Sequence, residues 1–577
     1  MEFDISIEAR NLLRIGKMLG SNESPTEMVN RVSRTLFEIE EKFGTAQNAI
    51  YNLTNRFENL ILQKRIALST PIITNAGRHL KKPLSACTVL ALDQKIDIFS
   101  IRKSVTQAHL DGMGTGFNLD NSEEPIQTLK ILNSVAIDIT NSRNEERPVG
   151  NIAIMSVHNP KISEFISVKD GADIRNEVWK FNLSVDITKK FMSAVKKGVN
   201  YRLSDGQMVS ARQVFNSIAE NAYKSGDPGI IFMHRFEKDN PTTAFGRYGG
   251  VAPCGEVGLM TGEACQFGSI NLGKFVKNEP KGKNIDYDAL KDAVSLLTRA
   301  LDNSLEISIP LYSEVKTRNV MSFRRKIGVG ICGLADLLGQ LHLAYDSDEA
   351  RLKSIEVISF INYVSKLESH RLAKSRGSFN AILTSRYMEK PGFLESRYQE
   401  SGTAVVTKEM WKDLADEIRN SRLLRNVSTI ALPPTGRSAT IVDASHGIEP
   451  FFTLSSNCGM INRYLYEELL QIKKVDLQTI KDIRRTGSIQ HIDGIPEVIK
   501  NSYKTGLEIS PEMQIEMCAG IQKVVDDAIS KTVNLSRSAT VDDIRQIYLS
   551  GYEKGLKGIT VFREGSRSRQ PKKLALV

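Results

Sequence analysis

The chain has 577 residues, of which 77 are Lys or Arg and 67 are Asp or Glu, so its formal net charge is +10. Hydrophobic residues make up 41% and charged residues 25%, which excludes a disordered, collagen-like or disulfide-scaffold protein. Basic and acidic residues are interleaved, so we expect a phosphorylated small molecule and no nucleic acid as partner. The six cysteines are too few for a secreted scaffold, and no window approaches the roughly 18 apolar residues of a membrane span. The sequence therefore predicts a cytoplasmic protein without a membrane partner.

The predicted elements begin with a helical region over 1–80, where apolar residues recur at spacings of three and four. Beyond it, short β-branched runs alternate with amphipathic segments, which is typical of an α/β protein with mainly parallel strands. We expect one large domain and a flexible basic tail over 565–577. The predicted strands are 87–92, 151–157, 181–187, 229–234, 268–275, 326–330, 427–432 and 558–562. The predicted helices are 126–139, 211–223, 287–305, 349–374, 408–419, 514–529 and 541–552.

Two glycine clusters suggest either ligand binding or close packing. Gly328, Gly330 and Gly333 match G-x-G-x-x-G, but the charged residues before them do not resemble a buried strand, so a strand-to-helix turn is favoured over a dinucleotide site. In the segment DGMGTGFN, Gly114 and Gly116 would bring backbone close to a ligand or make a turn. Zinc signatures such as H-E-x-x-H and C-x-x-C are missing, and we expect no metal site.

Two further segments carry possible chemistry. If residues 251–257 are extended, Ala252, Cys254 and Glu256 share one face, although Pro253 and Gly255 favour an irregular loop. The alternative is a structural cysteine beside a surface glutamate. In residues 431–440, backbone N–H groups with Thr435, Arg437 and Ser438 would make a phosphate cradle or an ordinary capped helix start.

Taken in order, ten blocks of the sequence resemble the large subunits of ribonucleotide reductases, specifically the adenosylcobalamin-dependent class II. The blocks are STPIITNAG, LSACTVLAL, GMGTGFN, DPGIIFMHR, APCGEVGL, EACQFGSINL, RKIGVGICG, LPPTGRSAT, HGIEP and KGITVFREGS. The resemblance implies a ten-stranded α/β barrel over 81–564, built from two five-stranded parallel halves. A central finger loop would carry Pro253 to Gly255, and the helical region would precede the barrel.

The resemblance also implies the roles of individual residues. Cys254 would become the thiyl radical that takes the 3′-hydrogen of a ribonucleotide, and Glu256 would act as general base. Cys87 and Cys265 would supply the reducing equivalents and end as a disulfide, while Cys332, Cys458 and Cys518 would be structural. The residues implied to contact the substrate are Thr70, Cys87, Gly114, Ala252, Cys254 and Glu256, with Pro434, Thr435, Gly436, Arg437 and Ser438 at its phosphates.

The radical source implied by this resemblance is adenosylcobalamin. Class I relatives carry two adjacent tyrosines where this chain has Thr560, Val561 and Phe562, and a class III enzyme would need zinc cysteines, whereas no cysteine follows Cys518. Because the tail also lacks a cysteine pair, we expect a thiol reductant such as a thioredoxin-like protein to act directly. A homodimer is the family habit.

One departure from the family keeps alternatives open. The family finger usually reads Asn-x-Cys-x-Glu, but position 252 is alanine, so a side-chain amide near the substrate is missing. The first interpretation is a ribonucleotide reductase for common ribonucleotides. The alternatives are a specialised relative acting on an unusual nucleotide and a catalytically silent nucleotide-binding homologue.

Overall fold

The structure is a computed structural model of the chain, and it describes residues 2–79, 81–92, 98–142, 149–172, 174–280, 282–456 and 458–566. The predicted α/β class is confirmed, because parallel strands alternate with helices through most of the described chain. Apart from Gly565 and Ser566, the predicted tail over 565–577 lies outside the described residues. None of the helices in the described ranges is long and apolar enough to cross a membrane.

The N-terminal part is mostly helical, with α1 (Ile7–Ile15), α2 (Pro25–Glu38), α3 (Gln47–Leu62), β1 (Ile66–Leu68) and α4 (Thr70–Asn75). Ser24 begins α2 with a capping box, because its side chain accepts from Glu27 N–H while the Glu27 carboxylate accepts from Ser24 N–H. The apolar stripe of α2, including Met28, Val32 and Leu36, is buried in the same hydrophobic core as the central strands. These helices therefore pack on the rest of the molecule.

The first half of the molecule contains five parallel strands in the order β2 (Cys87–Val89), β3 (Gly114–Asn118), β4 (Asn151–Ser156), β5 (Phe181–Asp186) and β8 (Gly229–Ile231). The connecting helices include α5 (Ile98–Leu110), α6 (Pro125–Asn141), α7 (Ile162–Ser167), α8 (Lys189–Lys197) and α9 (Ala211–Ser225). The strand predicted over 229–234 ends earlier, since α10 (Met233–Lys238) begins directly after it.

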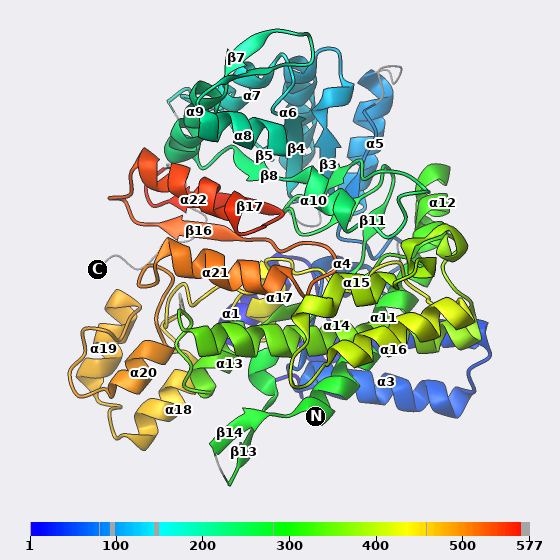
Figure 1. Cartoon of the computed structure of the whole chain (residues 1–577). Helices are drawn as coiled ribbons and strands as arrows, with labels where there is room; N and C mark the ends of the chain where they lie inside the picture. The colour runs from blue at the N-terminus through cyan, green and yellow to red at the C-terminus, as the bar shows by residue number, and fades with distance from the viewer. Residues whose placement is uncertain are drawn as a thin grey trace.

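The C-terminal strands complete this sheet far from their neighbours in sequence. β17 (Gly558–Arg563) pairs antiparallel with β8 and parallel with β16 (Thr532–Leu535), and α22 (Val541–Glu553) connects β16 to β17. Figure 1 shows these red elements beside the cyan and green strands of the first half. At the opposite edge, β11 (Ala264–Cys265) pairs antiparallel with β2.

A second group of strands is centred on β12 (Phe267–Asn271), which pairs antiparallel with β1 and parallel with β15 (Gly328–Cys332). The strand predicted over 427–432 is reduced to isolated parallel bridges, Val329 with Ile430 and Leu432 with Ile529. Gly333 has φ of +73° and starts α13 (Leu334–Gln340), so the predicted strand-to-helix turn is confirmed. The basic residues Arg324, Arg325 and Lys326 do lead into the buried strand β15. They are compatible with it because they are themselves buried with carboxylate partners.

Helices of six to 29 residues cover this second group. They are α11 (Tyr287–Ser308), α12 (Val315–Arg324), α14 (Asp348–Arg376), α15 (Phe393–Tyr398) and α16 (Lys408–Ser421). In Figure 1, α14 and α16 cross the lower part of the molecule, and α18 (Arg463–Gln471), α19 (Leu477–Thr486) and α20 (Glu497–Ser502) form a lobe at one side. The lobe has a small core of its own that includes Leu465, Ile483 and Ile499. Two hairpins, β6 (Asn200–Arg202) with β7 (Met208–Ser210) and β13 (Val276–Glu279) with β14 (Gly282–Ile285), complete the strands outside the finger loop.

The helix predicted over 514–529 is wrong at its C-terminal end. α21 spans Pro511–Gln522, and the chain then leaves the helix so that Asp527 N–H donates to Ile430 O and Ala528 N–H donates to Glu256 O. The apolar spacing of a helix continues to residue 529, but the backbone of Asp527 and Ala528 makes hydrogen bonds with Ile430 and Glu256 instead. Tertiary hydrogen bonds therefore override the helical pattern.

Candidate active site

The segment around Cys254 is a narrow hairpin with an irregular tip. Its arms are β9 (Gly250–Val251) and β10 (Gly258–Leu259), and Gly255 at the tip has φ of +75°. Gly255 N–H donates to Ala252 O at 2.8 Å, and Ala252 N–H donates to Val257 O at 3.0 Å. The tip is thus a turn, so the irregular loop favoured by Pro253 and Gly255 is confirmed and the extended alternative does not apply. Ala252 is buried among Val89, Leu259 and Phe267, whereas Cys254 is exposed.

The glycines of β3 allow this hairpin to lie against the strand. A Cβ at Gly116 would stand 2.1 Å from Val251 O, and a Cβ at Gly114 would stand 2.5 Å from Gly150 O and 3.0 Å from Pro253 Cγ. Both positions therefore need a residue without a side chain. The turn interpretation does not apply to Gly114 and Gly116, because both lie within β3, and contact of this cluster with a ligand stays a prediction.

Cys87 and Cys265 lie directly opposite each other on neighbouring antiparallel strands, β2 and β11. Cys87 is half-buried and Cys265 is buried, and both are free thiols. Burial and the adjacent Cys87 sulfur raise the pKa of Cys265 well above its ordinary value. The pair is therefore held as neighbouring thiols in a geometry from which a cross-strand disulfide can form.

Glu256 follows the hairpin tip and points into the interior. Its side chain is 3% exposed, and its Oε2 atom has no hydrogen-bond partner among the described residues. Burial raises the pKa of Glu256 to about 7, and the negative charge of Asp527 adds to the effect. A carboxylate with this proton affinity suits a general base at neutral pH.

A buried ion pair supports the second arm of the hairpin. Lys326 Nζ donates to Gly258 O on the second arm at 2.7 Å and pairs with Asp527 at 2.8 Å, and the Asp527 carboxylate also accepts from Ser428 Oγ. The next residue, Ala528, donates its N–H to Glu256 O at 2.9 Å. Glu256 is thus fixed through its own backbone and through the second arm of the hairpin.

Cys87 and Glu256 open into one cavity of about 280 Å³, called here the cysteine cavity. It is lined by Ser69, Thr70, Pro71, Ala86, Cys87, Glu256, Phe267, Gly268, Ser269, Pro433, Thr435, Gly436, Arg437 and Ser438. Three of its polar atoms, Ser69 Oγ, Glu256 Oε2 and Arg437 Nη1, are buried without a hydrogen-bond partner in the described chain. Buried polar groups of this kind are normally satisfied, so the cavity is built for a polar ligand.

At one end of the cysteine cavity, α17 (Gly436–Ile441) begins. Thr435, at φ of +54°, precedes the helix, and its Oγ1 accepts from Gly447 N–H at 2.8 Å. The first N–H groups of a helix have no intrahelical partner and favour an anion. With the Arg437 cation beside them, this end suits phosphate groups.

The structure brings most of the sequence-predicted site residues to one place. Among the implied substrate contacts, Thr70, Cys87, Glu256 and Thr435 to Ser438 line the cysteine cavity, while Gly114, Ala252, Cys254 and Pro434 do not. Sequence reasoning missed seven further lining residues, which are Ser69, Pro71, Ala86, Phe267, Gly268, Ser269 and Pro433. All of these lie within or beside the blocks that carried the resemblance, so proximity to Thr70, Cys265 and Pro434 could have suggested them.

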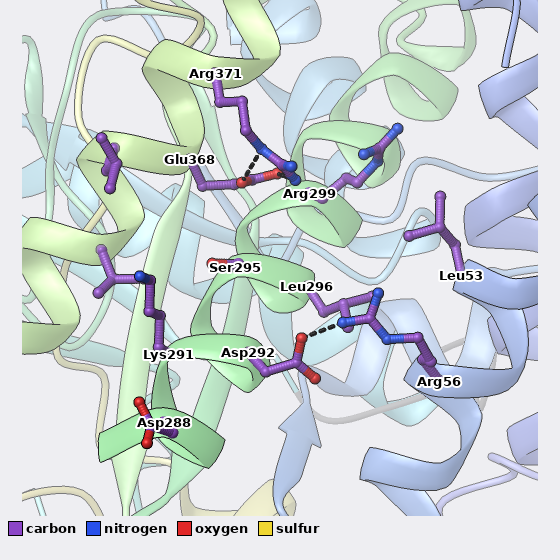
Figure 2. Close-up of a pocket in the computed structure, with 12 residues that line it drawn as sticks. Leu53, Arg56, Asp288, Lys291, Asp292, Ser295, Leu296, Arg299, Glu368 and Arg371 are labelled. Atoms are coloured by element: carbon purple, nitrogen blue, oxygen red, sulfur yellow. Dashed lines mark hydrogen bonds and ion pairs between the residues drawn. The ribbon is translucent and has the colours of Figure 1, made fainter. Parts of the chain in front are cut away.

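A groove between α3, α11 and α14 is larger, at about 370 Å³, but its charged groups are largely paired with one another. Figure 2 shows Arg56 of α3 bonded to Asp292 of α11 across this groove, and Arg371 bonded to Glu368 along α14. Its lining contains no cysteine and no unpartnered buried polar atom of the described chain. The cysteine cavity is therefore the candidate active site.

Comparison with known proteins defines the family. Residues 85–562 match the model of the ribonucleotide reductase barrel domain. The chain is 28% identical to a vitamin B12-dependent ribonucleoside-diphosphate reductase of Mycobacterium tuberculosis over 99% of this chain and 81% of that protein. It is 30% identical to the protein of the same name from Thermoplasma acidophilum, over 93% of this chain and 69% of that protein.

The solved structures agree at the level of the fold. The class Id ribonucleotide reductase alpha subunit of Actinobacillus ureae superposes with a TM-score of 0.76 at 19% identity, covering 98% of each chain. The chain described here belongs to the ribonucleotide reductase family, within which these relatives are named as vitamin B12-dependent enzymes.

Proposed function

We propose that the chain is an adenosylcobalamin-dependent ribonucleotide reductase, which converts ribonucleotides to 2′-deoxyribonucleotides for DNA synthesis. The observation that carries the proposal is the cysteine cavity itself. A thiol of the cross-strand pair, an unpartnered carboxylate oxygen and an unpartnered guanidinium nitrogen line one space that ends at a helix start. A ribose with a phosphate tail complements this arrangement.

In the proposed reaction, Cys254 acts first as a thiyl radical and takes the 3′-hydrogen of the ribose. Glu256 accepts the proton of the 3′-hydroxyl, for which its raised pKa is suited. Cys87 and Cys265 then give up two electrons and two protons, the 2′-hydroxyl leaves as water, and the two sulfurs join as a disulfide. The 3′-hydrogen finally returns to the ribose from Cys254, and the 3′-oxygen regains its proton from Glu256.

The fingertip has room for a large group beside Cys254. The thiol is exposed, and a Cβ placed on the adjacent Gly255 would have no neighbour within 4 Å. Cys254 and Gly255 would therefore face adenosylcobalamin, which supplies an organic radical when bound. The vitamin B12-dependent relatives support this choice of cofactor.

We propose the domain limits from the same family relation: a helical region over 1–80 and a ten-stranded barrel over 81–564. The strand pairings support two parallel halves, with β12, β15, segments 430–432 and 529–535, and β17 as the second. The halves would join antiparallel at β11 with β2 and at β17 with β8. The homodimer, the thioredoxin-like reductant and the cytoplasmic location remain predictions.

The test of the proposed function is turnover of each common ribonucleotide with adenosylcobalamin and dithiothreitol. The wild-type chain should form deoxynucleotides, and Cys254→Ala should form none. Cys458→Ala is the matched control, because Cys458 is also exposed but lies outside the hairpin that carries Cys254. Product formation by Cys254→Ala would overturn the mechanism.

A specific observation keeps the specialised relative as a second candidate. Ala252 carries no side-chain amide, and Glu256 Oε2 has no hydrogen-bond partner among the described residues. Failure of all four common ribonucleotides, together with cobalamin-dependent exchange of tritium between the cofactor and water, would favour this candidate. Loss of both activities would favour a catalytically silent homologue.

A further inference from the structure

Two consecutive aspartates, Asp526 and Asp527, form the centre of a buried charge cluster. The Asp526 carboxylate pairs with Lys366, and the Asp527 carboxylate pairs with Lys326 at 2.8 Å. Lys557 Nζ donates to the backbone carbonyl oxygens of both aspartates. All three lysines are buried. The pair of aspartates is therefore held by cations from three separate segments of the chain.

The cluster reaches the hairpin formed by β9 and β10 through two hydrogen bonds to its backbone. Lys326 Nζ, while paired with Asp527, donates to the first backbone oxygen of β10 at 2.7 Å. Ala528 N–H donates to Glu256 O at 2.9 Å. The second oxygen of the Asp527 carboxylate accepts from Ser428 Oγ at 3.0 Å. Asp527 is therefore fixed relative to the hairpin, both through its ion pair and through the next residue of the chain.

Glu256 has few charged or titratable neighbours. It lines the cysteine cavity together with Cys87 and Arg437, and its charge acts on Cys265. The Cys265 thiol is neutral near pH 7, because burial and the adjacent Cys87 raise its pKa well above the ordinary value. Burial raises the pKa of Glu256, and the negative charge of Asp527 raises it further. The proton affinity of Glu256 is therefore coupled to the charge of Asp527.

We propose that Asp527 is a positioning residue for Glu256, because its pair with Lys326 holds the second arm of the hairpin and its carboxylate places a negative charge beside the proposed base. This inference rests on the proposed function, in which Glu256 accepts the proton of the 3′-hydroxyl. A nearby negative charge strengthens a base because it favours uptake of a proton. Asp527 is not among the described residues that line the cysteine cavity, so it acts through Glu256.

The test compares the pH dependence of kcat/KM in the wild-type chain and in Asp527→Asn. The asparagine keeps the size of the side chain, and its oxygen can still accept a hydrogen bond from Lys326, but the negative charge is lost. The rise expected near pH 7 should therefore move to lower pH by about one unit. A rise at the same pH in both chains would overturn the proposal.

Asp526→Asn is the matched control. The Asp526 carboxylate pairs with Lys366 of α14 and accepts from the hydroxyl of Tyr398 in α15 and from Thr429 N–H, so its removal disturbs the same cluster at contacts outside the hairpin. In this variant the rise should stay near pH 7. An equal shift in both variants would show that general loosening of the cluster moves the rise, and it would overturn the specific role of Asp527.

A double variant covers the case in which Asp527→Asn fails to fold because buried Lys326 loses its carboxylate partner. Lys326→Gln combined with Asp527→Asn removes both charges together. The glutamine can still donate a hydrogen bond to the backbone of β10, so the hairpin keeps a donor at this place. The double variant should also show the rise at lower pH than the wild-type chain, and an unchanged rise would overturn the proposal.

An infrared titration of the full chain, without nucleotide or cofactor, separates this inference from the proposed function. The band of the protonated Glu256 carboxyl is identified by its loss in Glu256→Gln, and its midpoint should fall in Asp527→Asn by about one pH unit. This shift in a chain that forms no deoxynucleotide would keep the coupling of Asp527 to Glu256 while the proposed function failed. Equal midpoints in wild-type and Asp527→Asn chains that both turn over would overturn the inference and leave the proposed function standing.

Discussion

Glu256 combines two properties that set the pH dependence of the proposed reaction. It is buried beside an unfilled cavity, and burial raises its pKa to about 7. Because a general base acts only when ionised, kcat/KM should rise with pH through about 7 and level off above it. Rates measured from pH 5.5 to 9 with a saturating reductant would show this rise.

The matched variant separates Glu256 from other titrating groups. Glu256→Gln should lower kcat by a factor of about 10² to 10⁴ and remove the rise near pH 7. The raised pKa of Glu256 also affects the stability of the folded chain. Because the folded pKa lies above the ordinary value of 4.5, ionised Glu256 costs stability as pH rises through about 7. An unchanged acid limb in Glu256→Gln would show that another group titrates.

At the scale of elements, the hairpin formed by β9 and β10 packs closely against β3 because Gly116 of β3 has no side chain. A methyl group at Gly116 would stand 2.1 Å from the backbone oxygen of Val251, and neither atom belongs to a flexible side chain. Gly116→Ala should therefore push the hairpin away from β3, lower stability by about 1–3 kcal/mol and reduce turnover more than substrate binding. Thermal unfolding and separate kcat and KM values would measure both effects.

Gly150→Ala is the control for this prediction. An added methyl at Gly150 would also face the hairpin, but at an ordinary 3.4 Å from Pro253 Cβ. This variant should keep near-normal stability and activity. If both substitutions have the same small effect, the close fit of β3 to the hairpin is not what positions Cys254.

At the scale of the whole molecule, a buried ion network ties the N-terminal region to the rest of the chain. Glu40 is fully buried, accepts two hydrogen bonds from Arg299 at 2.7 Å each and pairs with Arg376. Burial alone would raise the pKa of Glu40, but Arg299 and Arg376 lower it to about 2. The ion pairs of Glu40 with Arg299 and Arg376 therefore stabilise the fold at neutral pH. This contribution is lost as pH falls from about 4.5 toward 2.

Glu40→Ala should lower the free energy of unfolding by about 3–5 kcal/mol, because it removes the buried carboxylate that pairs with Arg299 and Arg376 and, within the described chain, leaves only Arg376 with a second carboxylate partner, Asp302. The chain should still unfold in one transition, since the N-terminal helices share a core with the strands. Asp292→Ala is the control: its pair with Arg56 joins the same regions but is about half exposed (Figure 2), so it should cost at most about 1 kcal/mol. Separate melting of 1–80 in calorimetry would contradict a shared core.

The sequence by itself determined the α/β class, most helix positions and the residues that carry the chemistry. Amphipathic spacing marks α6, α9, α11, α14, α16 and α22 within a few residues, because each helix buries one continuous stripe. The ordered motifs pointed to Cys87, Cys254, Glu256 and Cys265 through resemblance to a family. Local patterns could not reveal that 526–529 leaves a helical spacing to bond with the finger hairpin.

Only the tertiary structure decided what faces the cavity. Ala252 is buried and Cys254 is exposed at the tip where Gly255 makes a tight turn, and Gly116 is required by a carbonyl from a segment more than a hundred residues away. The partners of Lys326 and Glu40 likewise come from distant parts of the chain. Helix periodicity depends on neighbours three or four residues apart, whereas burial and charge pairing at a site depend on contacts that form only when remote strands meet.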